Sequence, residues 1–332
     1  MTKAEHLQTV AILVPGDFND HAVDRIEHTF RRIKIERADP TLVTDEMRSN
    51  VRAIASFAGI NAAMMDALPN LELVASFGVG YDSVDVGHAA AKNIMVTNTP
   101  DVLTEEVADT AIGLLINTVR ELYNAERWLR DGSWVRKGNY PLSRLTLRGR
   151  RVGIFGMGRI GKAIARRLEA FGLPVAYHNR RQVEGLGYQY HPTLKGLAEA
   201  VDTLISVAPG GASTERAVNA EILSALGANG VFVNIGRGST VDEAALAAAL
   251  ANGTIAAAGL DVFADEPNVP KALLDAPNAS LLPHVGSASD HTRRAMADLC
   301  VDNLVSWFTG RRPLTPVPET VNVKAKAIPG KV

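Results

Sequence analysis

The segment that most constrains the fold is a glycine-rich turn at residues 152–161, which read VGIFGMGRIG. An apolar run leads into it, and the amphipathic stretch KAIARRLEAFG follows. Three glycines at this spacing are weak evidence alone, but between a strand pattern and a helix pattern they are typical of a dinucleotide-binding turn. The first glycine permits the turn, the second lets the backbone approach a pyrophosphate, and the third allows close helix packing, while the helix N-terminus receives the phosphates. The residues predicted to contact the cofactor here are Gly156, Met157, Gly158, Arg159, Ile160 and Gly161.

The end of the next strand pattern indicates which dinucleotide binds. A site that prefers NAD usually has a carboxylate there, which accepts hydrogen bonds from the ribose. This chain instead has Asn179, Arg180 and Arg181, beginning 179 − 161 = 18 residues after the last glycine. No carboxylate repels a 2′-phosphate, and two guanidinium groups can bind one. We therefore expect NADP(H) to be preferred over NAD(H).

Short apolar runs alternate with amphipathic stretches along the chain, as expected of βαβ units around parallel sheets. With 332 residues, the chain is long enough for two domains. Strands are predicted at 9–14, 34–38, 52–57, 71–78 and 93–98, and a second series starts at residue 150. One long helix is predicted from Thr104 towards Arg130, and another over 288–308, followed by a tail without regular structure. The predicted domains are residues 1–100 with 288–332, and residues 101–287.

The net charge and the cysteine content argue against several classes of function. Thirty-five basic residues against thirty-six acidic ones give a net charge of −1, which argues against nucleic acid or an anionic membrane as a partner. No apolar stretch is long enough to span a membrane. The single cysteine, Cys300, allows neither an internal disulfide nor a cysteine-based zinc site. We expect a cytoplasmic protein without a bound metal.

Candidate reactive side chains follow three strand patterns of the second series. Arg237 lies in VNIGRG, Asp261 and Glu266 lie in GLDVFADEP, and His284 lies in LLPHVGSAS. In open α/β sheets the carboxyl ends of the strands form the ligand crevice. The sequence therefore predicts that these side chains gather at one edge of one sheet.

At this point the sequence resembles the D-isomer-specific 2-hydroxyacid dehydrogenases, most of all the glyoxylate/hydroxypyruvate reductases. The resemblance covers nearly the whole chain and includes VASFGVGYDSVD, NTPDVLTEEVADT, GMGRIG, NIGRG, DVFADEP and PHVGSAS, in the family's order. It implies a Rossmann-type, doubly wound parallel sheet that binds the dinucleotide, and a second, flavodoxin-like α/β domain for the substrate. It also implies NADPH-dependent reduction of a 2-keto acid to a D-2-hydroxy acid.

The resemblance implies a role for each candidate residue. Arg237 would hold the substrate's carboxylate and carbonyl oxygen, and His284 would be the general acid. Glu266 would orient the imidazole and favour its protonated form, because a nearby carboxylate stabilises imidazolium. The remaining predicted contacts are Val79, Gly80 and Ser287 for the substrate, and Val207, Ala208, Pro209, Ile235, Asp261 and Gly286 for the cofactor.

In the family, the long helix and the loop after it form a dimer interface. Here that region contains Trp128, Trp134 and Tyr140. Aromatic side chains are suitable interface anchors, although they can also pack within their own subunit. We expect a homodimer. We also expect the two domains of each chain to close around the ligands by hinge motion.

Other functions remain open at this stage. Reductases of larger keto acids, such as hydroxyphenylpyruvate or 2-ketogluconate, share the motifs. Formate dehydrogenases place Gln where Glu266 stands, and many phosphoglycerate dehydrogenases carry an additional C-terminal domain. A corepressor-like protein that binds dinucleotide without turnover is an alternative of a different class, because a fold alone does not determine function.

Overall fold

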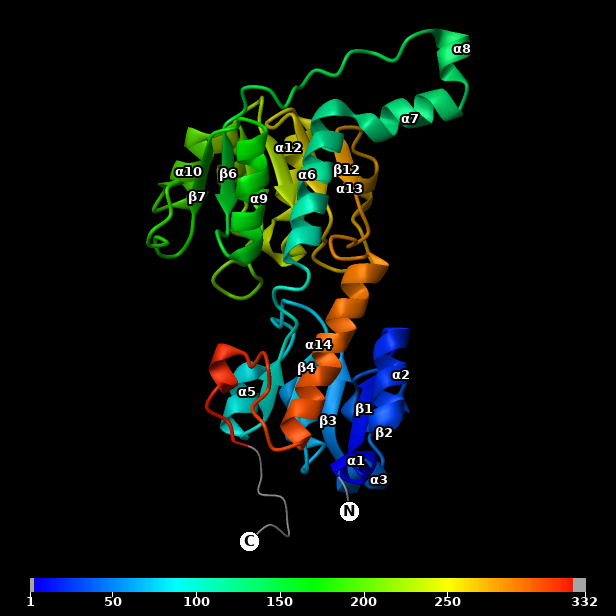
Figure 1. Cartoon of the computed structure of the whole chain (residues 1–332). Helices are drawn as coiled ribbons and strands as arrows, with labels where there is room; N and C mark the ends of the chain where they lie inside the picture. The colour runs from blue at the N-terminus through cyan, green and yellow to red at the C-terminus, as the bar shows by residue number, and fades with distance from the viewer. Residues whose placement is uncertain (1–2, 325–332) are drawn as a thin grey trace. The chain divides into compact units, whose positions relative to one another are not determined.

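The computed structural model describes residues 3–324, and the chain divides into two compact units (Figure 1). Unit 1 comprises Met1–Leu103 and Ser289–Val332, and unit 2 comprises Thr104–Ala288. The predicted crossings after residues 100 and 287 lie close to these divisions. Within the described range, no helix combines the length and the apolar character needed to cross a membrane.

Unit 1 contains a five-stranded parallel sheet in the order β2-β1-β3-β4-β5. This is the strand order of the flavodoxin-like fold, and it reverses direction between β1 and β3. The prediction of a flavodoxin-like domain is therefore confirmed. The strands are β1 (Ala11–Pro15), β2 (Arg31–Ile35), β3 (Val51–Ser56), β4 (Leu73–Ser76) and β5 (Met95–Thr97).

Helices cover both faces of this sheet (Figure 1). Helices α2 and α14 pack together on one face, and α4 and α5 lie with the 3-10 turn η3 on the other. The apolar faces of these helices and strands form the core, in which Leu13, Ile54 and Val74 are fully buried. The helical elements are α1 (Lys3–Gln8), α2 (Asp20–Thr29), α3 (Asp45–Asn50), α4 (Ala62–Asp66), α5 (Val86–Ala91), α14 (Asp290–Phe308), η1 (Pro40–Leu42) and η3 (Pro318–Thr320).

Unit 2 contains a seven-stranded sheet in the order β12-β11-β10-β9-β6-β7-β8, parallel throughout. Its direction reverses between β6 and β9, as in the Rossmann arrangement. The Rossmann-type prediction is therefore confirmed. The strands are β6 (Val152–Phe155), β7 (Val175–His178), β8 (Gln189–Tyr190), β9 (Thr203–Ser206), β10 (Val231–Asn234), β11 (Ala257–Leu260) and β12 (Ala279–Leu281).

Helices also lie on both faces of the second sheet. Helices α6 and α9 pack together over one face, while α10, α11 and α12 pack in a row over the other. Four strands of this sheet are buried along their full length, namely β6, β9, β10 and β11, which explains their continuous apolar sequences. The helical elements are α6 (Thr104–Arg120), α9 (Arg159–Ala170), α10 (Leu194–Ala200), α11 (Ala220–Leu226), α12 (Glu243–Ala251), α13 (Lys271–Leu274) and η2 (Gly238–Thr240).

The prediction of one long helix to Arg130 is wrong. Helix α6 ends at Arg120, and Glu121 takes the left-handed conformation with φ of 54°. The side chain of Asn117 then accepts a hydrogen bond of 2.9 Å from the N–H of Tyr123, which caps the start of a new helix. Helices α7 (Leu122–Arg130) and α8 (Ser133–Lys137), with the chain that returns from them to β6, form an arm that extends from the body of unit 2 (Figure 1).

Two further predictions need correction. The second strand lies over Arg31–Ile35 rather than residues 34–38. It is an edge strand, which tolerates charged residues, and its three charged residues conceal the apolar pattern. The segment after α14 is also structured up to residue 324. The N–H of Val317 donates to the carbonyl of Val96, and the Thr315 hydroxyl donates to the carbonyl of Asn98. The rest of the predicted tail, residues 325–332, lies outside the described residues.

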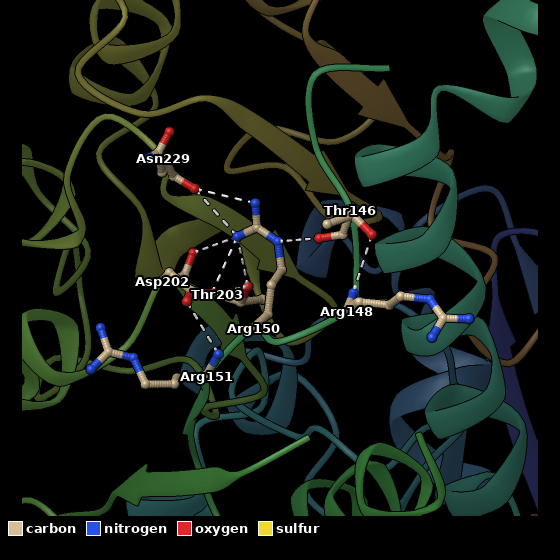
Figure 2. Close-up of polar contacts among 7 residues, drawn as sticks. All are labelled: Thr146, Arg148, Arg150, Arg151, Asp202, Thr203 and Asn229. Atoms are coloured by element: carbon tan, nitrogen blue, oxygen red, sulfur yellow. Dashed lines mark hydrogen bonds and ion pairs between the residues drawn. The ribbon is translucent and has the colours of Figure 1, made fainter. Parts of the chain in front are cut away.

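A buried arginine holds together the amino edge of the unit 2 sheet. Figure 2 shows the Arg150 guanidinium between the carbonyls of Thr146 and Asn229, with Asp202 and Thr203 beside it. Arg150 is 7% exposed, and burial lowers the pKa of its guanidinium. Its hydrogen bonds join the loop before β6 to the starts of β9 and β10, and so fix the strands whose opposite ends carry the candidate site.

Candidate active site

The predicted dinucleotide turn lies at the carboxyl edge of the unit 2 sheet, between β6 and α9. Gly156 has φ of +106°, and a Cβ added there would lie 2.7 Å from the N–H nitrogen of Ala208. A Cβ at Gly161 would lie 2.3 Å from the Gly156 carbonyl oxygen. A Cβ at Gly158 would meet no atom within 4 Å. Two glycines therefore permit close packing, and Gly158 faces open space, as an approaching pyrophosphate requires.

Of the three predicted cofactor residues after β7, Asn179 holds the glycine turn in place, whereas Arg180 and Arg181 are exposed to solvent. The side-chain oxygen of Asn179 accepts a hydrogen bond of 2.6 Å from the N–H of Met157, in the middle of the glycine turn. The Tyr190 hydroxyl donates to the Asn179 carbonyl and fixes that residue further. Arg180 and Arg181 are exposed. The residue types therefore fit a cofactor that carries an additional phosphate on its ribose.

The predicted wall of the cofactor site is formed by the chain after β9 and β10. The N–H of Val207 donates to the carbonyl of Phe155, and the N–H of Ile235 donates to the carbonyl of Ser206. Ala208 and Ile235 are buried, whereas Pro209 is exposed. These hydrogen bonds extend the sheet ladder by one residue and place this wall beside Gly156.

His284 and Glu266 form a close pair. The Nδ1 atom of His284 lies 2.7 Å from Oε2 of Glu266, and the two side chains are 38% and 35% exposed. The other carboxylate oxygen of Glu266 accepts a hydrogen bond of 2.9 Å from the N–H of Phe263. Glu266 is therefore held at one oxygen and contacts the imidazole with the other. With Nδ1 engaged in this way, Nε2 is the ring nitrogen left to exchange a proton with a substrate.

The backbone of His284 is strained. Its φ is 53°, in the left-handed region that is uncommon for residues other than glycine, although Asn, Asp and His adopt it more often than the rest. Strain of this kind persists only where surrounding contacts impose it, and it is frequent at active sites. Here the N–H of His284 donates to the Asp261 carbonyl, and the next two N–H groups donate to the Asp261 carboxylate.

The buried carboxylate of Asp261 holds the turn at residues 284–286 in place. Its side chain is 1% exposed and accepts hydrogen bonds of 2.7 Å from the N–H of Val285 and 2.9 Å from the N–H of Gly286. Burial raises the pKa of Asp261, and the two backbone donors oppose that rise. A Cβ at Gly286 would lie 2.9 Å from the same carboxylate, so this position favours glycine. The observed task of Asp261 is thus to shape the His284 turn, and its contact with a nicotinamide stays a prediction.

Arg237 follows β10, next to the strand that leads to Glu266. It is half-buried, and its Nη1 atom donates to the carbonyl of Gly236. A Cβ at Gly238 would lie 1.8 Å from the carbonyl carbon of Phe263, so only glycine lets these two loops meet. Sequence reasoning did not assign a structural role to Gly238. A glycine directly after a candidate site residue could have indicated a close approach between two loops. Strands β10, β11 and β12 are neighbours, so Arg237, Glu266 and His284 follow three adjacent strands.

The predicted substrate residues of unit 1 lie in a loop after β4. The Asn98 side chain donates to the Val79 carbonyl at 2.8 Å, and the N–H of Thr99 donates to the Gly78 carbonyl at 2.8 Å. These contacts fix the loop that contains Val79 and Gly80, and sequence reasoning did not assign Asn98 this task. Ser287 is half-buried, and Ser289, not Ser287, caps α14 by accepting a hydrogen bond from the N–H of Thr292.

With this geometry established, comparisons identify the class of protein. Residues 112–286 match the family model described as D-isomer specific 2-hydroxyacid dehydrogenase, NAD binding domain. The chain is 42% identical, over 94% of its length and the whole of the relative, to glyoxylate/hydroxypyruvate reductase A of Arabidopsis thaliana. The chain therefore belongs to the D-isomer specific 2-hydroxyacid dehydrogenase family, and the predicted resemblance is confirmed.

Two further relatives refine the comparison. A crystal structure of an NADPH-dependent glyoxylate/hydroxypyruvate reductase from Sinorhizobium meliloti, in complex with NADP and malonate, is 64% identical to this chain. It superposes with a TM-score of 0.94 and covers 96% of this chain and 100% of its own. The hydroxyphenylpyruvate reductase of Plectranthus scutellarioides is 46% identical, over 81% of this chain and 86% of the relative.

Proposed function

We propose that this protein reduces small 2-keto acids, glyoxylate and hydroxypyruvate, to D-2-hydroxy acids with NADPH. The observation that carries the proposal is the His284–Glu266 pair, which lies at the same sheet edge as the glycine turn. The relatives named for these substrates at 42% and 64% identity support the choice of keto acids.

The residues of unit 2 fit a bound NADPH, which supplies the hydride when present. Gly158 leaves room for the pyrophosphate, and the first turn of α9 has no side-chain cap, so its N–H groups remain suitable for phosphate. Arg180 and Arg181 would hold the 2′-phosphate. The reductase of Sinorhizobium meliloti, crystallised with NADP, supports this preference.

The acid–base work would belong to His284. Protonated on both nitrogens, it donates one N–H to Glu266 and offers the other to the carbonyl oxygen of the substrate. As the alkoxide develops, the proton moves to that oxygen, while Glu266 keeps the ring in place. Arg237 would bind the substrate carboxylate, for which a guanidinium offers paired donors. The roles of Val79, Gly80 and Ser287 in binding the substrate stay predictions.

The direct test is oxidation of NADPH with glyoxylate or hydroxypyruvate as the acceptor. We expect turnover by the natural chain, and His284→Ala should lower kcat by about 10²–10⁴-fold, the usual contribution of a general acid. His291→Ala, at an exposed histidine of α14, is the matched control. NADPH binding should persist in both variants. Absence of turnover with either keto acid would contradict the proposal.

A second test addresses the cofactor. The double change Arg180→Ser with Arg181→Ser should raise the KM for NADPH by about 10- to 100-fold, since each charged hydrogen bond contributes about 1.5–3 kcal/mol. The KM for NADH should change little. Arg148→Ser, at another exposed arginine of unit 2, is the control. An equal change in the KM values for NADPH and NADH would show that these arginines do not bind the 2′-phosphate.

The protein is also proposed to be a homodimer that associates through the arm. Trp134, Val135 and Leu142 are 56%, 93% and 95% exposed there. A hollow of about 790 Å³ lies beside α7, between it and the edge strand β12. Trp128 and Tyr140 instead pack on each other at 5.8 Å between ring centroids, and so stiffen the arm of their own chain. A second copy of this chain would cover the exposed side chains.

Light scattering at micromolar concentration tests the dimer. Val135→Asp combined with Leu142→Asp should shift the mass to that of a monomer. Phe171→Asp, at a side chain that is 51% exposed outside the arm, should leave the mass unchanged. A natural chain that scatters as a monomer would contradict this proposal.

A cytoplasmic location is likewise proposed, supported by a single buried cysteine, and cell fractionation would test it.

A further inference from the structure

The loop after β4 contains two backbone N–H groups, those of Val79 and Gly80, that are predicted to bind the carboxylate of the substrate. In the described part of unit 1, no group accepts a hydrogen bond from either of them. Successive N–H groups hold an anion only when they converge on it. Their direction must therefore be set by contacts at other atoms of the same two peptide groups.

Each of these peptide groups is held at its carbonyl end. A peptide group is planar and trans, so its N–H points opposite to its C=O. The N–H of Val79 shares a peptide group with the Gly78 carbonyl, which accepts a hydrogen bond of 2.8 Å from the N–H of Thr99. The N–H of Gly80 shares a peptide group with the Val79 carbonyl, which accepts one of 2.8 Å from the side-chain amide of Asn98. These two hydrogen bonds therefore fix the direction of both donors.

Only the contact of Asn98 depends on the type of residue. The N–H at position 99 is a backbone group, which every residue except proline supplies, whereas the donor at position 98 is a side chain. Asn98 is 9% exposed, so its amide is largely shielded from water. A hydrogen bond accepted by a carbonyl also polarises its peptide group, and so makes the N–H at the other end a stronger donor. Asn98 thus acts on both the direction and the strength of the N–H of Gly80.

The backbone of Asn98 is held by the segment that follows α14. This segment runs antiparallel to the end of β5, where Thr97 pairs with Pro316. The N–H of Asn98 donates to the Thr315 carbonyl at 3.3 Å, and the Thr315 hydroxyl donates to the Asn98 carbonyl at 2.6 Å. One residue of the segment therefore contacts both polar backbone groups of Asn98.

Thr315 is held in turn by Asn303, a residue of α14 that is 0% exposed. The side-chain amide of Asn303 donates to the Thr315 hydroxyl at 2.8 Å, and its side-chain oxygen accepts from the Thr315 N–H at 3.0 Å. Because the hydroxyl oxygen accepts from Asn303, its own proton is directed to the Asn98 carbonyl. A continuous chain of hydrogen bonds therefore runs from α14 to the carbonyl of Val79.

We propose that Asn98 is a positioning residue that directs the N–H of Gly80 towards the carboxylate of the substrate, and that Thr315 and Asn303 hold Asn98 in place. The inference rests on the proposed function, because it needs a 2-keto acid to bind at the loop after β4. It adds to that function a dependence of substrate affinity on side chains that act through this loop.

The first test compares Asn98→Ala with the natural chain. A contact to the carboxylate is made in the bound substrate and in the transition state alike, so its loss raises KM and leaves kcat unchanged. We expect the KM for glyoxylate to rise about tenfold, the contribution of a hydrogen bond to a charged group. The KM for NADPH should not change. Oxamate, which resembles glyoxylate but is not reduced, should inhibit the variant about tenfold more weakly.

Asn278→Ala is the matched control. The side-chain amide of Asn278 also donates to backbone carbonyls, at 3.2 Å to Leu250 and at 3.1 Å to Ala256. Asn278 directly precedes β12, so it lies at the amino edge of the unit 2 sheet. Its loss should leave the KM for glyoxylate unchanged. Thermal unfolding of both variants separates a loss of stability from a loss of substrate binding.

A second pair of variants tests the support of Asn98. Thr315→Val keeps the shape of the side chain but lacks the hydroxyl, whereas Thr315→Ser keeps the hydroxyl. We expect the KM for glyoxylate to rise about threefold in Thr315→Val, as for the loss of a neutral hydrogen bond, and to stay at the natural value in Thr315→Ser. If Asn98→Ala does not fold, this pair decides the proposal, and equal KM values in both variants would overturn it.

Failure of the inference and failure of the proposed function give different results. If the natural chain reduces glyoxylate but Asn98→Ala keeps its KM, or if the KM for NADPH rises equally, the positioning role is disproved and the proposed function stands. If the natural chain reduces neither glyoxylate nor hydroxypyruvate, the proposed function fails, and the positioning role fails with it.

Discussion

The two parallel sheets of this chain start their first helices in opposite ways. In unit 1, the helix after the first strand begins at Asn19, whose side chain accepts a hydrogen bond of 3.1 Å from the N–H of Ala22. In unit 2, the helix after the first strand begins at Gly158, which has no side chain to serve as a cap. One helix satisfies its own end, and the other leaves N–H groups that a phosphate can use.

The amino edges of the two sheets, by contrast, resemble each other. Arg52 makes two hydrogen bonds to Glu72, which is 4% exposed, at the start of β3 and β4. Arg150 occupies the corresponding edge in unit 2 (Figure 2). The two sheets therefore share their parallel architecture and an arginine anchor at the amino edge. They differ in a few residues at the carboxyl edges, namely glycines in unit 2 and Asn98 in unit 1.

The largest expected effect concerns the amino edge. Arg150→Met should lower the free energy of unfolding by about 3 kcal/mol, because removing one partner leaves Asp202 and several carbonyls unpaired in a buried place. Arg151→Met, at the exposed neighbour in Figure 2, should have little effect. Urea unfolding followed by circular dichroism measures both. Equal stability of the two variants would mean that Arg150 does not anchor the sheet.

The next effect tests the uncapped helix. Gly158→Asp should raise the KM for NADPH by about 100-fold, because a carboxylate would occupy and repel the phosphate position, at roughly 1.4 kcal/mol per tenfold change. An added side chain finds open space there, so stability should hold. Gly113→Asp, at an exposed glycine of α6 with similar room, is the control. An unchanged KM for NADPH in Gly158→Asp would contradict the assigned cofactor site.

A smaller effect is expected at the capped helix of unit 1. Asn19→Ala removes the hydrogen bond to the N–H of Ala22 and should reduce stability by about 1 kcal/mol. The KM for NADPH should not change, which distinguishes this helix start from that of α9. Thermal unfolding and NADPH titration together measure the contrast. If Asn19→Ala lost NADPH affinity but not stability, the start of α2 would be part of the cofactor site, and the contrast with α9 would be wrong.

The smallest effect concerns the thiol of Cys300 in unit 1. Burial raises its pKa to about 12, so at pH 8 the thiol is protonated and covered, and iodoacetamide should not label it in the folded protein. Labelling in urea should follow the unfolding of unit 1. If Arg150→Met leaves the labelling midpoint unchanged, the two units unfold separately. Rapid labelling of the native protein would show that the core around α14 opens.

Much of the candidate site was predictable because its signals are local. The glycine turn lies between a strand and a helix within ten residues, and Glu266 and His284 each follow an apolar strand pattern. The break at Glu121 was not predictable, since it depends on the Asn117 side chain accepting from Tyr123 and on the Tyr140 hydroxyl bonding the Glu121 carboxylate. The position of β2 was hidden for a different reason, because three of its five residues are charged, which a strand at a sheet edge tolerates.

By itself, the sequence determined the fold class, the glycine turn between a strand and a helix, and the positions of the candidate side chains after strand ends, because strand periodicity and glycine spacing are encoded within short segments. Only the tertiary structure decided what those side chains contact. It made Asp261 the anchor of the strained His284 turn, and it required Gly238 so that two loops could meet. It also joined Thr315 to Asn98, 217 residues apart, in one chain of hydrogen bonds. Contacts between distant segments depend on how strands are ordered in a sheet, and no local pattern records that order.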